Sequence, residues 1–251
     1  MRRAAAEAVG TAALVAVVVG SGIQATELTR DVGVQLLANS LATVFGLGVL
    51  ITLLGPISGA HFNPVVTLAA YFTSRRTADG LSLREVAAYI PAQITGAIGG
   101  AVLADAMFAR PLVNWSTHDR FAGHLWLGEL VATAGLVWLI FGLTQAGRAH
   151  LAPAAVASFI GSAYWFTSST SFANPAVTIG RAFTDTFAGI APGSVTPFLA
   201  AQLAGAAAGL ALVAITFGRP ASATGDEIVV PHGEQQLAAP SRPAEESALS
   251  S

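Results

Sequence analysis

Few side chains in this sequence of 251 residues could do chemistry, and the most distinctive ones occur in two matched sets. Each set has a glutamate, then an Asn-Pro pair, then a glutamine. The sets are Glu7, Asn63-Pro64 and Gln93, followed by Glu129, Asn174-Pro175 and Gln202. An asparagine side chain caps free N–H groups at a helix start, and proline fits the first helical position. Each Asn-Pro pair therefore predicts a helix N-terminus, which carries unpaired N–H donors and partial positive charge.

Covalent and metal chemistry lack the residues they need. The sequence has no cysteine, which excludes disulfides and thiolate chemistry. Its five histidines are scattered along the chain, at His61, His118, His124, His150 and His232. Such a scatter gives no scaffold for a metal site or a Ser-His pair. We therefore predict no catalytic residues, no metal and no cofactor.

The composition is typical of a membrane protein, because 53% of the residues are hydrophobic and only 10% are charged. The formal charge of -2 is nearly balanced, so we predict no nucleic-acid partner. Apolar runs near the length of about 20 residues that crosses a bilayer predict six spanning helices. We expect them at about residues 6–24, 34–54, 84–107, 124–145, 150–167 and 195–218. The first run has no cleavage site, so we interpret it as a retained span.

Two stretches do not fit the six spans, at residues 55–73 and 168–187. Each opens with small and polar residues, contains one Asn-Pro pair and then turns apolar. Each is too interrupted to span a bilayer and too apolar to lie in water. We therefore predict two re-entrant segments, each with a half-helix that starts at its Asn-Pro pair.

The two halves of the chain repeat one another, and the repeat includes both re-entrant segments. Gln93 follows Asn63 by 30 residues, and Gln202 follows Asn174 by 28. Each half holds three spans, an odd number, so the second half enters the membrane from the opposite side. The two half-helix N-termini should therefore meet near the midplane. This predicts an all-α membrane domain at residues 1–218, with inverted repeats at about 5–107 and 124–218.

The distribution of arginine predicts the orientation of the chain in the membrane. Eight arginines fall on the side of the termini: Arg2, Arg3, Arg75, Arg76, Arg84, Arg148, Arg219 and Arg242. Only Arg30, Arg110 and Arg120 fall on the other side. Positive loops stay inside, so both termini should be cytoplasmic. Residues 219–251 are polar and rich in Pro, Ser, Ala and Glu, and we predict a disordered cytoplasmic tail there.

The paired boxes within an inverted repeat resemble the aquaporin and aquaglyceroporin family, also called the major intrinsic proteins. The boxes read Asn63-Pro64-Val65 and Asn174-Pro175-Ala176, where the family usually has Asn-Pro-Ala. The resemblance implies a right-handed bundle of six helices and two half-helices, with one pore per subunit. It also implies a homotetramer in the lipid bilayer of the cell membrane. The cargo would be water or small uncharged solutes such as glycerol, urea and neutral metalloid acids, which cross passively.

The resemblance also points to a selectivity filter, and this sequence departs from the family there. Family members typically carry arginine three residues after the second box asparagine, where this chain has Val177. Family spacing adds Ser162 and Ser171, with Thr43 as the second-span residue and Phe45 as its alternative. A filter lined by Thr43, Ser162, Ser171 and Val177 has small side chains without charge, so we expect it to be wide. Arg181 lies one helical turn after Val177 and could either replace the missing cation or face solvent and headgroups.

Three further residues are predicted to hold the pore loops. A carboxylate at membrane depth is costly, and we expect Glu7 and Glu129 to accept hydrogen bonds from loop N–H groups. The alternative is that these two carboxylates relay protons. His61 should brace the first loop. The rival function is a secondary transporter with inverted repeats, which the scarcity of charged residues disfavours.

Overall fold

The structure is a computed structural model of the chain, and it describes residues 1–75 and 80–218. The regular elements of these residues are all helical. They are α1 (Arg2–Leu28), α2 (Val32–Ser58), α3 (Pro64–Ser74), α4 (Leu83–Met107), α5 (Gly123–Gln145), the 3-10 turn η1 (Ala149–Leu151), α6 (Ala152–Phe166), α7 (Pro175–Arg181) and α8 (Pro192–Phe217). The predicted tail at residues 219–251 lies outside the described residues.

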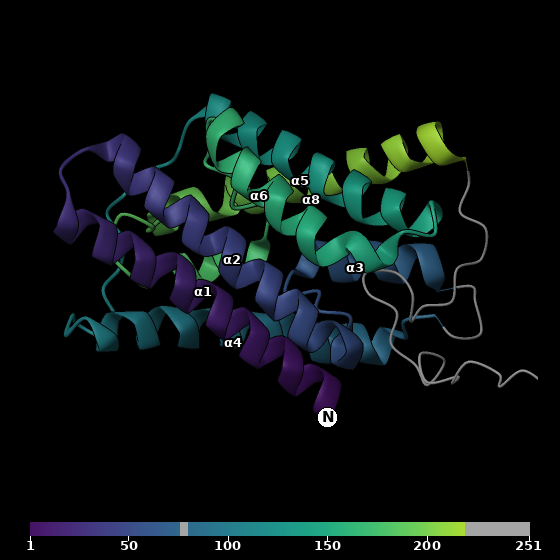
Figure 1. Ribbon diagram of the computed structural model, residues 1–251, viewed down its shortest axis with the longest axis horizontal. Coiled ribbons are helices and arrows are strands. Elements are labelled where there is room, and N and C mark those ends of the chain that lie inside the picture. Colours follow the sequence, from purple (N-terminus) through teal and green to yellow (C-terminus); the bar gives the residue numbers. More distant parts are fainter. Residues whose placement is uncertain (76–79, 219–251) are drawn as a thin grey trace, which may run out of the picture.

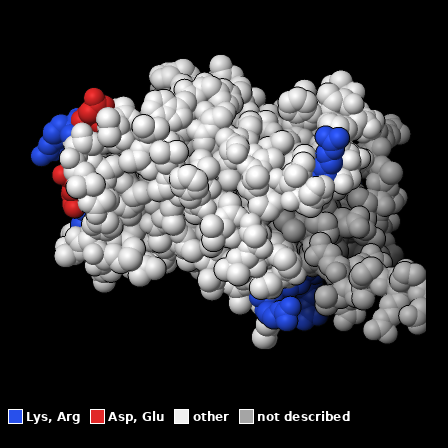
Figure 2. All heavy atoms as spheres, in the orientation of Figure 1, with Lys and Arg blue, Asp and Glu red and all other residues white. Residues whose placement is uncertain are grey.

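Five of the six predicted spans are helices long and apolar enough to cross a membrane: α1, α2, α4, α5 and α8. The predicted span at 150–167 is shorter, because α6 has 15 residues and follows directly on the 3-10 turn η1. Large apolar side chains face outward, as Phe45, Val49 and Ile215 do. Charged side chains gather toward the ends of the molecule in Figure 2 and leave a broad uncharged belt between them. This surface suits lipid, and the protein is a multi-pass membrane protein.

The two halves pack in the same way, as an inverted repeat requires. α1 lies along α4 in the first half, and α5 lies along α8 in the second (Figure 1). Glycines make both contacts close. A Cβ atom at Gly205 or Gly209 would lie 2.5 or 2.6 Å from the carbonyl oxygen of Leu130 or Ala134. In the first half, Gly96 and Gly100 meet the carbonyls of Ala8 and Ala12 even more closely. Small residues thus allow close helix contact where apolar burial gives no driving force.

A larger side chain at one of these glycines should prevent assembly of the bundle. We expect Gly100→Leu to leave little or no monodisperse protein, because the new side chain overlaps the backbone of α1. The matched control is Gly99→Leu, since a Cβ atom at Gly99 meets nothing within 4 Å. Size-exclusion chromatography of the detergent-solubilised protein measures both variants. Equal yields of folded protein from the two variants would show that the α1–α4 contact tolerates separation.

Both predicted half-helices form and begin where the sequence indicates. Asn63 caps α3 and accepts a hydrogen bond from the backbone N–H of Val65. Asn174 caps α7 and accepts from the N–H groups of Ala176 and Val177. In each case the proline occupies the first turn. α2 continues through Pro56 to Ser58, so the first re-entrant segment begins later than residue 55.

Candidate pore and filter

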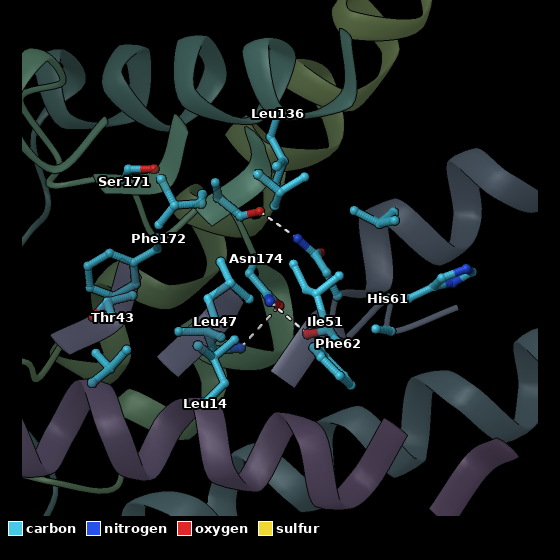
Figure 3. A pocket seen from close by; sticks show the side chains of 18 of the residues that line it. Leu14, Thr43, Leu47, Ile51, His61, Phe62, Leu136, Ser171, Phe172 and Asn174 are labelled. Carbon is cyan, nitrogen blue, oxygen red and sulfur yellow. Dashed lines mark hydrogen bonds between the residues drawn. The ribbon is translucent and has the colours of Figure 1, made fainter. Parts of the chain in front are cut away.

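A central cavity runs between the two half-helices, and we call it the pore cavity. α1, α2, α5 and α6 contribute aliphatic side chains to it, and the two loops before the half-helices contribute polar groups. In Figure 3, Leu14, Leu47 and Ile51 lie to one side of Asn174, with Leu136 on the other. Thr43 and Ser171 lie toward one end of the view and His61 toward the other. The cavity therefore has apolar walls with hydrogen-bonding groups placed along it, which suits a solute that is neither ionic nor fully apolar.

The two loops have the same backbone conformation. Positive φ angles occur four, three and one residues before each box asparagine: at Gly59, Ala60 and Phe62 in the first loop, and at Thr170, Ser171 and Ala173 in the second. Five of these six residues are not glycine. A non-glycine residue in this region costs on the order of 1–3 kcal/mol, so the surroundings must hold it in place.

Glu7 holds the first loop from α1. Its carboxylate is fully buried and accepts hydrogen bonds from the backbone N–H groups of His61 and Phe62, at 3.0 and 2.6 Å. The hydroxyl of Ser58 and the side-chain amide of Gln93 also donate to it, at 2.6 and 2.8 Å. Four donors around one buried carboxylate offset the cost of its burial.

Glu129 does the same for the second loop from α5. It accepts from the backbone N–H groups of Phe172 and Ala173, both at 2.8 Å, and from the amide of Gln202 at 2.6 Å. Each glutamine also donates to a half-helix threonine, Gln93 to Thr67 and Gln202 to Thr178, both at 2.9 Å. The matched Glu and Gln residues of the sequence thus form matched hydrogen-bond networks.

The two box asparagines bind each other's loops. The side-chain amide of Asn63 donates to the carbonyl of Ala173 at 2.8 Å, and that of Asn174 donates to the carbonyl of Phe62 at 2.7 Å. An amide carries two N–H donors, so one remains on each asparagine to face the pore cavity that both residues line. On each asparagine, one amide N–H holds the two half-helices together by bonding the other loop. The other N–H is available to a passing solute.

His61 lies at the end of the pore cavity near Glu7, toward the N-terminus of α1. Besides its backbone bond to Glu7, its Nδ1 atom lies 3.0 Å from the hydroxyl of Thr67, and its ring meets that of Tyr89 edge-on. The residue therefore contacts both α3 and α4 while it lines the cavity. This position agrees with a residue that braces the loop.

Two of the residues proposed for the filter do not face the pore. Ser162 is exposed on the outer surface of α6, and Phe45 is 68% exposed on α2, in an outer groove between these two helices. Among the residues that line the cavity from these helices, Thr43 lies two positions before Phe45 and Tyr164 two positions after Ser162. Two residues correspond to about 200° around a helix, so a count that is wrong by two selects the opposite face. The assignment of Ser162 and the alternative of Phe45 are therefore wrong.

Tyr164 brings an aromatic ring to a filter that was expected to have small side chains. Its hydroxyl lies 3.1 Å from that of Thr43. Thr43 donates its only proton to the carbonyl of Asn39 at 2.9 Å, so the Tyr164 hydroxyl is the donor to Thr43. This bond holds the ring in the lining of the pore cavity. Sequence reasoning missed Tyr164, although a tyrosine within an apolar helix is itself a signal that a polar partner lies nearby.

The second loop and α7 contribute Ser171, Val177 and Arg181 to the cavity lining. The hydroxyl of Ser171 has no hydrogen-bond partner within the described residues and lines the cavity. Val177 lines it too, where the sequence lacks the expected arginine. Arg181 is only 3% exposed, so the solvent-facing alternative is wrong. Its guanidinium lies 3.4 Å from the centre of the Phe172 ring, and its Nε atom donates to the carbonyl of Ala188.

A second hollow lies beside Arg181, and we call it the outer hollow. His118 and Arg120 line it from the segment between α4 and α5, residues 108–122, which we call the linker. Thr170 of the second loop and Arg181 of α7 also line it. The linker is held against residues 182–191 by backbone hydrogen bonds, such as Ala191 N–H to the carbonyl of His118 at 2.8 Å. Burial lowers the pKa of Arg120 to about 10, so this residue stays charged at neutral pH. Burial lowers the pKa of His118, and the positive charges of Arg120 and Arg181 lower it further. The neutral form of His118 is therefore favoured.

Comparison with known proteins agrees with this architecture. The profile of the major intrinsic protein family matches residues 1–172. The aquaglyceroporin AqpS of Rhizobium meliloti (strain 1021) is 49% identical over 212 residues, which cover 84% of this chain and 88% of that protein. Human aquaporin-2 is 36% identical over 115 residues, 43% of this chain and 41% of its own length. The solved aquaglyceroporin from Plasmodium falciparum superposes with a TM-score of 0.53 at 20% identity, covering 84% of this chain and 93% of that one.

Proposed function

Because this chain belongs to the major intrinsic protein family and is a passive channel for water and small solutes, we propose that its pore admits solutes of glycerol size. The observation that carries this proposal is the filter position of Val177, which has no charge and lines the pore cavity. The name of the relative AqpS, an aquaglyceroporin, supports the same class of solute.

The proposed filter combines a wide side with a polar side. Its members are Thr43, Tyr164, Ser171, Val177 and Arg181. The apolar surface of Val177 and the Tyr164 ring suits the carbon chain of a polyol. The Ser171 hydroxyl and the Arg181 guanidinium suit its oxygens, because both can donate hydrogen bonds. Selectivity then depends on the width of the filter and on the donors that line it.

We propose that the two box asparagines exclude ions and interrupt proton transfer. Asn63 and Asn174 cap helix N-termini that face one another, and each terminus carries roughly half a positive charge. A cation therefore meets an electrostatic barrier at the meeting point of the half-helices. Water must accept from the remaining amide N–H groups there, which breaks a continuous proton-conducting file.

Four wider features remain part of the proposal. Residues 1–218 form the channel domain, and both termini lie in the cytoplasm, as the arginine bias predicts. The channel works as a homotetramer in the lipid bilayer of the cell membrane. It has no catalytic activity and needs no cofactor.

The variant Val177→Arg tests the width of the filter. We expect glycerol permeability to fall by about ten-fold, or ~1.4 kcal/mol in the barrier, with a smaller change for water. The added guanidinium fills space beside Arg181 that a carbon chain needs. Stopped-flow light scattering of proteoliposomes measures both permeabilities.

Two further variants serve as controls for this test. Ser162→Ala and Phe45→Leu change residues that face outward, so both should keep the glycerol and water permeabilities of the wild type. Unchanged glycerol permeability in Val177→Arg, or a large change in Ser162→Ala, would contradict the proposed filter.

A further inference from the structure

The outer hollow holds two guanidinium groups close together. Arg120 is 9% exposed and Arg181 is 3% exposed, although they lie 61 positions apart in the sequence. Both guanidinium carbons lie within 5.0 Å of the centre of the Phe172 ring. Each Nε atom donates to a backbone carbonyl, that of Gly189 or Ala188. The terminal nitrogens of both groups donate to no described residue.

Among the described residues, no carboxylate pairs with either guanidinium. Neither Arg120 nor Arg181 forms an ion pair within residues 1–75 and 80–218. Glu129 is near enough to act on both charges, but the loop N–H groups and Gln202 occupy its oxygens. One carboxylate also cannot balance two cations.

The remaining acidic groups near the hollow have other partners. Asp119 accepts from the Phe121 N–H and the Ser194 hydroxyl. Asp185 accepts from the N–H and hydroxyl of Thr117. His118 also lines the hollow, and its lowered pKa favours the neutral form at pH 7.5, so it adds little charge. The hollow therefore carries an excess of positive charge.

A buried charge without a partner is costly, and an anion from solution removes that cost. The planar guanidinium offers two parallel N–H donors that match a carboxylate. The hydroxyl of Thr170, which also lines the hollow, has no hydrogen-bond partner among the described residues and adds a further donor. These donors come from three separate segments, the linker, the second loop and α7.

We propose that the outer hollow binds a small monovalent carboxylate between Arg120 and Arg181. Arg181 lines both the outer hollow and the pore cavity, so a bound anion holds this side chain at the mouth of the filter. The bound anion narrows the path and slows neutral solutes. This last step rests on the proposed function, whereas binding itself does not.

Binding is tested with formate on the purified full-length protein at pH 7.5. Thermal unfolding is followed at constant ionic strength, with formate replacing gluconate, a bulkier carboxylate that we expect the hollow to bind less tightly. We expect the unfolding midpoint to rise with formate and to saturate. In Arg120→Gln the apparent Kd for formate should weaken at least about ten-fold, because one charged donor pair is lost. Arg110→Gln is the matched control, since the Arg110 side chain is 37% exposed and pairs with Glu27, and the Kd of this variant should equal that of the wild type.

Arg120→Lys keeps the positive charge but loses the two parallel N–H donors of the guanidinium, so its Kd for formate should be intermediate. This variant also tests the site if Arg120→Gln does not fold. Equal midpoints in formate and gluconate, or an unchanged Kd in both Arg120 variants, would overturn the proposal. Glycerol flux in proteoliposomes separates the two claims. Formate binding without any glycerol flux would contradict the proposed function and still support the anion site. Glycerol flux that formate does not slow, despite binding, would remove only the link to the filter.

Discussion

Replacing Glu129 by glutamine should abolish most of the channel's solute flux and lower the temperature at which it unfolds. The carboxylate accepts three N–H donors, from Phe172, Ala173 and Gln202. A glutamine has one acceptor oxygen and an NH2 group, so at least one donor would face another donor. Each buried donor left unsatisfied costs about 1–3 kcal/mol, and the strained loop then loses the contact that holds it.

Stopped-flow light scattering and thermal unfolding of the purified protein measure this effect. Flux of water and glycerol should fall by at least about ten-fold, since a displaced loop moves the filter as well as the box. Glu27→Gln is the matched control, because Glu27 is exposed and only pairs with Arg110. It should match the wild type in both assays. A Glu129→Gln protein with normal flux and stability would show that the loop does not depend on this carboxylate.

Shortening Tyr164 to alanine should open the filter to larger solutes. The ring lines the pore cavity together with Ser171 and Val177, and its hydroxyl is hydrogen-bonded to that of Thr43. Without it, we expect glycerol permeability to rise by about three- to ten-fold, and a ten-fold rise corresponds to a barrier lower by ~1.4 kcal/mol. A polyol larger than glycerol, such as erythritol, should then become measurably permeant.

Two companion variants divide this effect into its parts. Tyr164→Phe removes only the hydroxyl and frees the ring from Thr43, so its increase should be smaller than that of Tyr164→Ala. Phe166→Ala removes an aromatic ring from the exposed side of α6 and should change nothing. Glycerol permeability that is unchanged or lower in Tyr164→Ala would mean that this ring does not limit the pore.

The sequence predicted best what depends on local chemistry and on the repeat. Asn63 and Asn174 were expected as caps because the preference of asparagine and proline for a helix start acts within a few residues. The hydrogen-bonding partners of Glu7 and Glu129 also follow from a local rule, that a buried carboxylate needs donors. The inverted repeat then placed each glutamate near a loop, and the structure shows both contacts.

Residues whose orientation depends on helix phase were harder to predict. Thr43 and Phe45 differ by two positions, as Ser162 and Tyr164 do, and each pair has one member in the pore and one outside it. Counting along the chain across a loop cannot fix this phase, because the loop length sets it. Thr43 was chosen correctly to face the cavity, and Ser162 was not.

Contacts between distant segments were beyond the reach of the sequence. Arg120 donates to the carbonyl of Gly189, 69 positions later, and no local pattern marks that pairing. The position of Arg181 was left open because one helical turn places it on the same face as Val177 without fixing how deeply it is buried. Its contact with the Phe172 ring depends on how the loop and α7 pack together.

The most direct test of the whole account is the concentration dependence of glycerol flux through the purified wild-type protein in proteoliposomes. A passive pore predicts a rate that rises linearly with the glycerol gradient, well above empty liposomes, and that ignores proton and sodium gradients. Flux that saturates at low concentration or follows an ion gradient would identify a transporter instead. A glycerol rate equal to that of empty liposomes, with rapid water flux, would show that the filter of Tyr164, Val177 and Arg181 passes only water.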